Sequence, residues 1–151
     1  MAIEPLGPVS KVVECADGTK EWFVDGKRHR LDGPAIVELN GTKEWFVHGK
    51  RHRPNGKPAV MFANGTKYWF VDGKQHRLNG KPAVEYANGA KYWFVDGKNH
   101  RLNGPAIMEI DGSKRWYLFG EEYTDTKVFE AAASMFKLLF PKHQSLGKNE
   151  L

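Results

Sequence analysis

The chain is built on an internal repeat, and a repeat of this length favours folds in which similar units stack along one axis. One phrase, Gly-Thr-Lys-Glu-Trp-Phe-Val-Asp-Gly-Lys-Arg-His-Arg-Leu-Asp-Gly-Pro-Ala, occupies residues 18–35. It returns from Gly41, Gly65 and Gly89, and a shortened copy starts at Gly112. Spacings of 23, 24, 24 and 23 residues separate the tryptophans that mark the five copies: Trp22, Trp45, Trp69, Trp93 and Trp116.

Two turn signals in each copy predict β-hairpins. The first is Asn-Gly or Asp-Gly, as at residues 40–41, and the second is Asp-Gly or His-Gly, as at residues 25–26. Such dipeptides suit two-residue hairpin loops, because both loop residues need positive φ. The middle copies add Lys57 and Lys81 between a Gly and a Pro, where so small an insertion belongs in a loop. We therefore predict an all-β repeat array over residues 11–123, in which tandem antiparallel β-hairpins form an elongated, twisted meander.

The predicted loops fix which side chains lie opposite one another. A two-residue loop at residues 40–41 places Ile36 opposite Trp45. The spine of the array is expected to contain the tryptophans, the column Ile36, Val60, Val84 and Ile107, and a histidine facing each of the first four tryptophans. These spine histidines are His29, His52, His76 and His100.

The arginine after each histidine is the candidate partner-binding position of the repeats. A two-residue loop at residues 25–26 places Glu21 opposite Arg30, and we expect an ion pair there and at the equivalent place in the second copy. Tyr68 and Tyr92 replace the Glu in the next two copies, where we expect cation–π contacts instead. The arginine column consists of Arg30, Arg53, Arg77 and Arg101.

Residues 124–141 change period and predict one C-terminal amphipathic helix. Thr124 is the expected N-cap, and Pro141 ends the helix. Two interpretations remain open: the helix caps the last hairpin, or part of it docks a partner protein or a second copy of the chain. The candidate docking residues are Phe129, Phe136, Leu139 and Phe140. Residues 1–10 are expected to be a lead-in, and residues 142–151 a loose polar tail.

The phrase Trp-x-x-x-Gly-Lys-x-His-Arg, followed by Asn-Gly or Asp-Gly, resembles the MORN repeat, whose units fold as consecutive β-hairpins. The resemblance covers residues 11–123, although MORN units usually carry Gly where this chain has Arg after the His. With that Arg, the phrase resembles short repeat proteins of bacteriophages and large DNA viruses. The resemblance implies a binding module, and specifically a phage-encoded accessory protein that binds and inhibits a host factor, such as a defence enzyme.

No motif in the sequence predicts catalysis, a metal site or a cofactor. Equivalent histidines lie two or three strands apart, about 10–14 Å, whereas the ligands of one zinc ion all lie about 2 Å from it. Cys15 has neither a zinc-ligand spacing nor an assigned base, and the glycines fit turns rather than a phosphate loop. We therefore expect a non-enzymatic protein without cofactor or metal. A single Cys and the lack of a long apolar stretch favour the cytoplasm, the host cytoplasm if the protein is viral.

The net charge of +5 arises from basic residues that recur in columns. The lysine columns start at Lys20 and Lys27. A cationic ladder with interleaved aromatic residues is able to bind a polyanion, although solvated lysine also protects strand edges from aggregation. The leading expectation is therefore a protein-binding module. The alternatives are polyanion or nucleotide binding (nucleic acid, anionic lipid) through the Arg, His and Lys columns, and a small virion or structural component.

Overall fold

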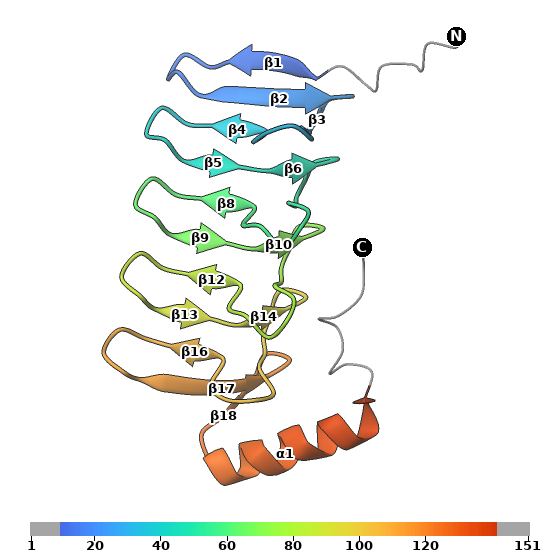
Figure 1. Ribbon diagram of the computed structural model, residues 1–151, viewed down its shortest axis with the longest axis vertical. Helices are drawn as coiled ribbons and strands as arrows, with labels where there is room; N and C mark the ends of the chain where they lie inside the picture. Colours follow the sequence, from blue (N-terminus) through green and yellow to red (C-terminus); the bar gives the residue numbers. More distant parts are fainter. Residues whose placement is uncertain (1–9, 142–151) are drawn as a thin grey trace.

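The computed structural model describes residues 10–141 and shows a stack of β-hairpins with a helix across one end (Figure 1). The strands of the main sheet are β1 (Lys11–Glu14), β2 (Lys20–Val24), β3 (Lys27–Arg28), β4 (Ile36–Val37), β5 (Lys43–Glu44), β8 (Val60–Met61), β9 (Lys67–Tyr68), β12 (Val84–Glu85), β13 (Lys91–Tyr92), β16 (Ile107–Met108), β17 (Lys114–Leu118) and β18 (Glu121–Tyr123). These 12 strands pair antiparallel in the order β1-β2-β4-β5-β8-β9-β12-β13-β16-β17-β18, with β3 beside β2. The predicted all-β repeat array is confirmed. Except for Ser10, the predicted lead-in and tail lie outside the described residues.

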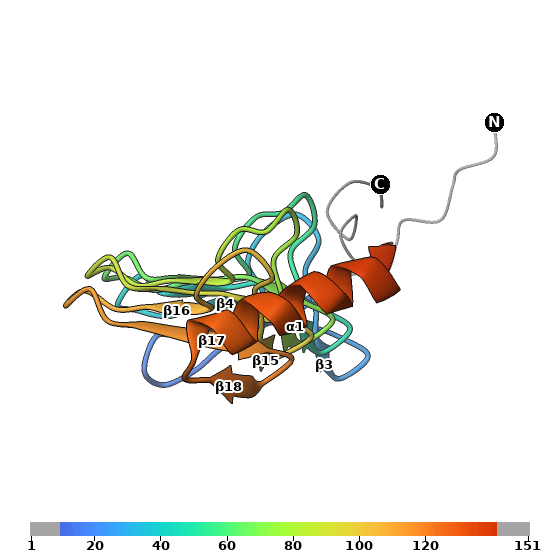
Figure 2. The ribbon, with the colours of Figure 1, turned by 90° about the horizontal axis from the view of Figure 1, so that it is seen from below.

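Three short hairpins leave the main sheet. They are β6 (Phe46–Val47) with β7 (Lys50–Arg51), β10 (Phe70–Val71) with β11 (Lys74–Gln75), and β14 (Phe94–Val95) with β15 (Lys98–Asn99). Viewed end-on, the main sheet extends to one side, and on the other side hairpins and loops diverge (Figure 2). Each of the three middle copies is therefore a main-sheet hairpin joined to a second, short hairpin.

In the middle copies the strand changes sheets at the tryptophan. Trp45 lies between β5 and β6. Its N–H donates to the Ala59 carbonyl beside β8 at 2.8 Å, and its carbonyl accepts from the His52 N–H of its own short hairpin at 3.1 Å. One residue thus satisfies its two backbone groups in two different ladders, which allows the strand to bend without losing hydrogen bonds.

The loop at the Asn-Gly signal has three residues rather than the two predicted. Ile36 pairs with Glu44 and not with Trp45, so that part of the register prediction is wrong by one position. The Asn40 side chain causes the difference, because its oxygen accepts the Thr42 N–H at 2.7 Å and forms an Asx turn. Only the following Gly has positive φ, as in three-residue hairpin loops.

The second loop has the two residues predicted. Val24 pairs with Lys27, and the loop residues Asp25 and Gly26 have φ values of 49° and 71°. Positive φ at both positions is the requirement of the type I′ turn. Between the two loops, the chain buries four fully covered alanines and the predicted aliphatic column: Ala35, Ala59, Ala83, Ala106, Ile36, Val60, Val84 and Ile107.

Helix α1 (Thr126–Leu139) lies across β17 and β18 (Figures 1 and 2). Its N-cap is Asp125 rather than Thr124, because the Asp125 carboxylate accepts the N–H groups of Lys127 and Val128 at 2.8 and 3.3 Å. Asp and Thr both suit this position, and Asp satisfies two of the free N–H groups at once. The buried side of the helix packs on Leu118 with Phe129 and Ala133. The helix therefore caps the last repeat, which was the first of the two interpretations.

Candidate functional site

Each spine histidine links its own copy to the next one. The backbone places His29 beside Trp22, as expected, since the His29 N–H donates to the Trp22 carbonyl at 3.0 Å. The ring makes a different contact, with Nδ1 accepting a backbone N–H from the following copy. The four bonds run to His29 from His48, to His52 from Asp72, to His76 from Asp96 and to His100 from Phe119, at 3.1–3.3 Å. An accepting nitrogen carries no proton, so these rings act as structural links between copies.

Each arginine of the column lies over a tryptophan. The guanidinium carbon is 3.6–4.2 Å from the ring centroid in the pairs Arg30/Trp22, Arg53/Trp45, Arg77/Trp69 and Arg101/Trp93. The predicted contacts with Glu21 and with the tyrosines are wrong. The backbone N–H of Arg30 donates to the Phe46 carbonyl of the next copy. The chain therefore no longer pairs with its own hairpin at Arg30, and Arg30 does not lie opposite Glu21.

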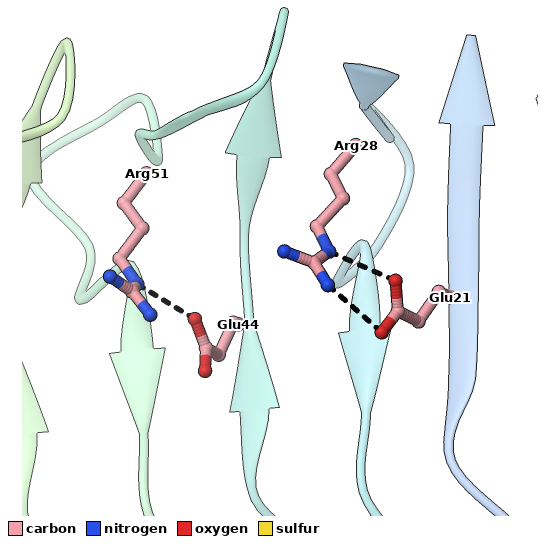
Figure 3. A network of polar contacts seen from close by, with 4 residues as sticks. All are labelled: Glu21, Arg28, Glu44 and Arg51. Atoms are coloured by element: carbon pink, nitrogen blue, oxygen red, sulfur yellow. Dashed lines mark hydrogen bonds and ion pairs between the residues drawn. The ribbon is translucent and has the colours of Figure 1, made fainter. Parts of the chain in front are cut away.

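The glutamates pair instead with the arginines before the histidines (Figure 3). Arg28 donates to both oxygens of Glu21 at 2.9 and 3.1 Å, and Arg51 donates to Glu44 at 2.7 Å. Further along the same face Arg115 lies 3.7 Å from a carboxylate oxygen of Glu109. We call this side of the main sheet the paired face; its central row is Glu21, Ile36, Glu44, Val60, Tyr68, Val84, Tyr92, Ile107 and Arg115.

The opposite side of the main sheet carries the first lysine column. Directly paired residues of an antiparallel sheet share a face, and one row of pairs reads Lys20, Val37, Lys43, Met61, Lys67, Glu85, Lys91, Met108 and Lys114. The arginine column joins this side, since guanidinium nitrogens of Arg53, Arg77 and Arg101 reach Met61, Glu85 and Met108. We call this side, with its five lysines and four arginines, the lysine face.

The loops that contain the inserted Lys57 and Lys81 each accept a hydrogen bond from the indole of a tryptophan. The Trp69 indole N–H donates to the Gly56 carbonyl at 2.9 Å, and the Trp93 indole to Gly80 at 2.8 Å. These carbonyls precede Lys57 and Lys81, and both rings are buried, with 5% and 7% exposed. The other three tryptophans are half-buried, and within residues 10–141 no hydrogen bond of their indole N–H groups is found. The extra residue thus completes the indole hydrogen bond.

A cleft of about 700 Å³ lies between the loop that follows Arg101 and the C-terminal part of α1. Its cationic wall includes Arg77, Lys81 and Arg101, and its aromatic wall includes Phe119 and Phe136. Among residues 10–141, no Asp or Glu lines it. Burial lowers the pKa of Arg101 from its usual range, because the charged guanidinium loses part of its hydration. The cleft suits an anionic group and repels a cation.

The outer side of α1 is apolar and exposed. Val128, Ala131, Met135 and Leu138 follow one another at intervals of three, four and three residues, and we call this row the helix seam. Leu138 is 82% exposed and Met135 64%. Of the four predicted docking residues, Leu139 and Phe140 are exposed beside the seam. Phe136 is half-buried against Phe119, and Phe129, with 3% exposed, faces the repeats and is unable to reach a partner.

The sequence predicts the lysine and arginine columns, but not that the first lysine column and the arginine column share one side of the sheet. That placement follows from the observed strand register and from the arginine contacts with Met61, Glu85 and Met108. The alternation of lysine with apolar residues along the pairing direction was the available signal. Within residues 10–141 no three His, Cys, Asp or Glu side chains gather closely enough to hold a metal ion. Over the same stretch, no helix has the length and apolar character needed to cross a membrane.

Comparison with protein-family models yields no match for this chain. A search of curated proteins likewise finds no match. The MORN resemblance therefore rests on the repeat phrase and stays a prediction.

Proposed function

We propose that this chain is a non-enzymatic protein-binding repeat module and that the helix seam is its principal binding surface. The supporting observation is an excess of apolar surface on α1. Phe129 and Ala133 suffice to cover Leu118, yet the seam presents further large apolar side chains to solvent. Exposed apolar patches of this kind mark interaction sites, because leaving them in water is unfavourable.

The seam spacing favours a helical partner. Residues that alternate by three and four positions repeat on average every 3.5 residues, which keeps one stripe facing a second helix along its length. A polar stripe, with Lys127 and Lys137 at its ends and Glu130 and Ser134 between them, runs along α1 beside the seam. A partner helix with an apolar stripe bordered by acidic residues would satisfy both features.

The repeat phrase supports a more specific form of this proposal. Because the phrase resembles those of phage proteins, we propose that the partner is a host protein, that binding inhibits it, and that the host cytoplasm is where they meet. A defence enzyme is the class of host protein that a phage gains most by inhibiting.

A pull-down from bacterial lysate with matched variants tests the binding surface. The wild type is expected to retain a stoichiometric partner, and the double variant Met135→Glu/Leu138→Glu is expected to lose it. Leu31→Glu is the control, since Leu31 is equally apolar and 78% exposed but lies in the repeats. A partner that binds the double variant as well as the wild type would contradict the assignment. A wild-type dimer that the double variant converts to monomer in light scattering would assign the seam to a second copy instead.

Plaque assays test the inhibitory role. On bacterial strains that each carry one defence system, expression of the wild type is expected to raise phage plating on at least one strain, and the double seam variant is not. Equal plating with and without the chain on every strain would refute the host-inhibitor form of the proposal, while leaving the pull-down result to decide the binding surface.

A further inference from the structure

We propose that the lysine face binds the sugar–phosphate backbone of a nucleic acid, as a function separate from protein binding by the helix seam. The proposal rests on the spacing of the cations on this face, on their lack of acidic partners, and on the contrast with the paired face of the same sheet.

The lysines form a row with a regular strand interval. Lys43 and Lys67 both pair with Met61, and Lys91 and Lys114 both pair with Met108, so successive lysines lie two strands apart. At about 4.8 Å per strand this interval is about 9.6 Å, and it recurs over all five copies. The row therefore offers cations at a constant interval along a rigid sheet.

The arginine column runs beside this row and is held in place. The Arg53 and Arg101 guanidinium groups lie over tryptophan rings, and each donates to a proline carbonyl, at 3.2 and 3.1 Å. A guanidinium fixed in this way loses little side-chain entropy when it contacts a phosphate, and its remaining N–H groups match phosphate oxygens.

Most of the cations on the lysine face lack an acidic partner. Among the described residues, three of the nine form ion pairs: Lys20 with Glu14, Arg30 with Asp32 and Arg77 with Glu85. The other six have no carboxylate within 4.0 Å in that part of the chain: Lys43, Lys67, Lys91, Lys114, Arg53 and Arg101.

The paired face shows the opposite arrangement. There Arg28 and Arg51 lie within ion-pair distance of Glu21 and Glu44 (Figure 3). Arg115 likewise lies within ion-pair distance of Glu109. One side of the sheet is therefore neutralised and the other keeps its positive charge. A charge excess confined to one face creates a directed field, which concentrates and orients an anionic partner.

The regular interval favours a nucleic acid over an acidic protein. A sugar–phosphate chain carries its charges at a constant interval, and so does this face, whereas carboxylates on a folded protein follow no constant interval. Trp69 and Trp93 are buried beneath Arg77 and Arg101, so these rings offer no platform for base stacking. Binding is therefore expected to occur through phosphates and to be independent of sequence. The cationic wall of the cleft, formed by Arg77, Lys81 and Arg101, continues the surface toward α1.

Fluorescence anisotropy with labelled oligothymidylate, RNA of the same length and duplex DNA tests the proposal and separates the sources of phosphate. The triple variant K43Q/K67Q/K91Q removes three cations of the lysine face. The control K50Q/K74Q/K98Q removes the same charge from the second lysine column, whose members lie in the short hairpins. Between about 50 and 200 mM NaCl, losing three phosphate contacts is expected to lower the slope of log affinity against log salt by about 2 on single strands. Affinity at the lowest salt should fall on the order of 100-fold in the face variant.

The control variant is expected to keep the wild-type salt slope, and circular dichroism is expected to show both triple variants folded. The double seam variant should bind the oligonucleotides like the wild type, which separates this result from the proposed protein binding. Equal weakening in both triple variants would overturn the proposal, since net charge alone would then explain binding. Absence of wild-type binding at the lowest salt, or equal affinity for a polyglutamate peptide, would overturn it as well.

Discussion

At the scale of single residues, tryptophan does the most to connect the copies. The ring of Trp69 supports an arginine of its own copy and donates to a loop of the preceding copy, while its backbone joins two sheets. Trp45 has the same backbone role, but no hydrogen bond of its indole is found within residues 10–141. The two residues therefore form a natural pair for measuring the indole hydrogen bond.

Trp69→Phe is expected to lower the free energy of unfolding by about 1–3 kcal/mol more than Trp45→Phe. Both changes remove similar volume, but only the first leaves the Gly56 carbonyl without the indole N–H. Urea denaturation followed by circular dichroism measures both values. Equal losses for the two variants would show that the indole hydrogen bond adds nothing to stability.

Two exposed aspartates make the turns sensitive to acid. Backbone N–H groups of Thr19 and Ser113 donate to Asp17 and Asp111, and these bonds hold the pKa of both carboxyls below its usual range. A lowered native-state pKa means that the stabilisation is complete above the unfolded-state pKa of about 3.9 and is lost as pH falls through the native value.

The variant Asp17→Asn/Asp111→Asn is therefore expected to unfold at a lower pH than the wild type. In the other copies Asn40, Asn64 and Asn88 accept the equivalent backbone N–H, from the residue two positions later. The Asn variant should therefore keep both turns intact without a titrating group. Far-UV circular dichroism across an acid titration, with both proteins compared at neutral pH as the control, measures the shift. Superimposable acid transitions would contradict the expectation.

At the scale of elements, the two sides of α1 have different roles: one side packs on the repeats and the other is exposed. Its inner side supplies Phe129 and Ala133 to the cluster around Leu118, and its outer side is the seam. A capping helix alone needs only the inner side. The residues that stabilise the fold and the residues proposed to bind a partner can therefore be changed independently.

Phe129→Ala is expected to cost about 3–5 kcal/mol of unfolding free energy, because it empties a buried site. Leu138→Ala is expected to change it by less than about 0.5 kcal/mol, because that side chain is mostly exposed. Chemical denaturation of both variants provides the comparison. A large loss in Leu138→Ala would mean that the seam is covered within the folded chain.

The sequence predicted the elements better than the contacts between them. The two-residue loop at Asp25-Gly26, the helix and the repeat array follow from local turn chemistry and period, and all are found. The Asn40 loop was misjudged because its side chain competes with the two-residue turn. The place of Arg30 was misjudged because its backbone partner lies in the next copy, which no pattern within one copy reveals.

At the scale of the whole molecule, each copy contacts chiefly its neighbours, so the array behaves as a one-dimensional stack. Stability in such a stack is the sum of unit terms and interface terms between neighbours. Because Ala59 and Ala83 hold equivalent buried positions, the segment 59–82 is one complete unit.

Deletion of residues 59–82 is therefore expected to give a folded, shorter protein. It joins Pro58 to Ala83 and so recreates the native junction sequence. Circular dichroism should retain the same spectral shape, and the urea dependence of unfolding should decrease in proportion to the lost surface. Deletion of residues 71–82 alone serves as the control, since it cuts within a unit and should unfold the chain. An unfolded product from the complete-unit deletion would mean that the copies are not interchangeable.

The two ends of the stack are unlike, since α1 lies across β17 and β18 whereas β1, within residues 10–141, has a neighbouring strand on one side only. Fibre growth by edge pairing needs two adhesive ends on every molecule. Within residues 10–141 a helix covers one end of the stack and not the other, so we expect assembly through the uncovered β1 end to stop at a head-to-head pair rather than to elongate into a filament.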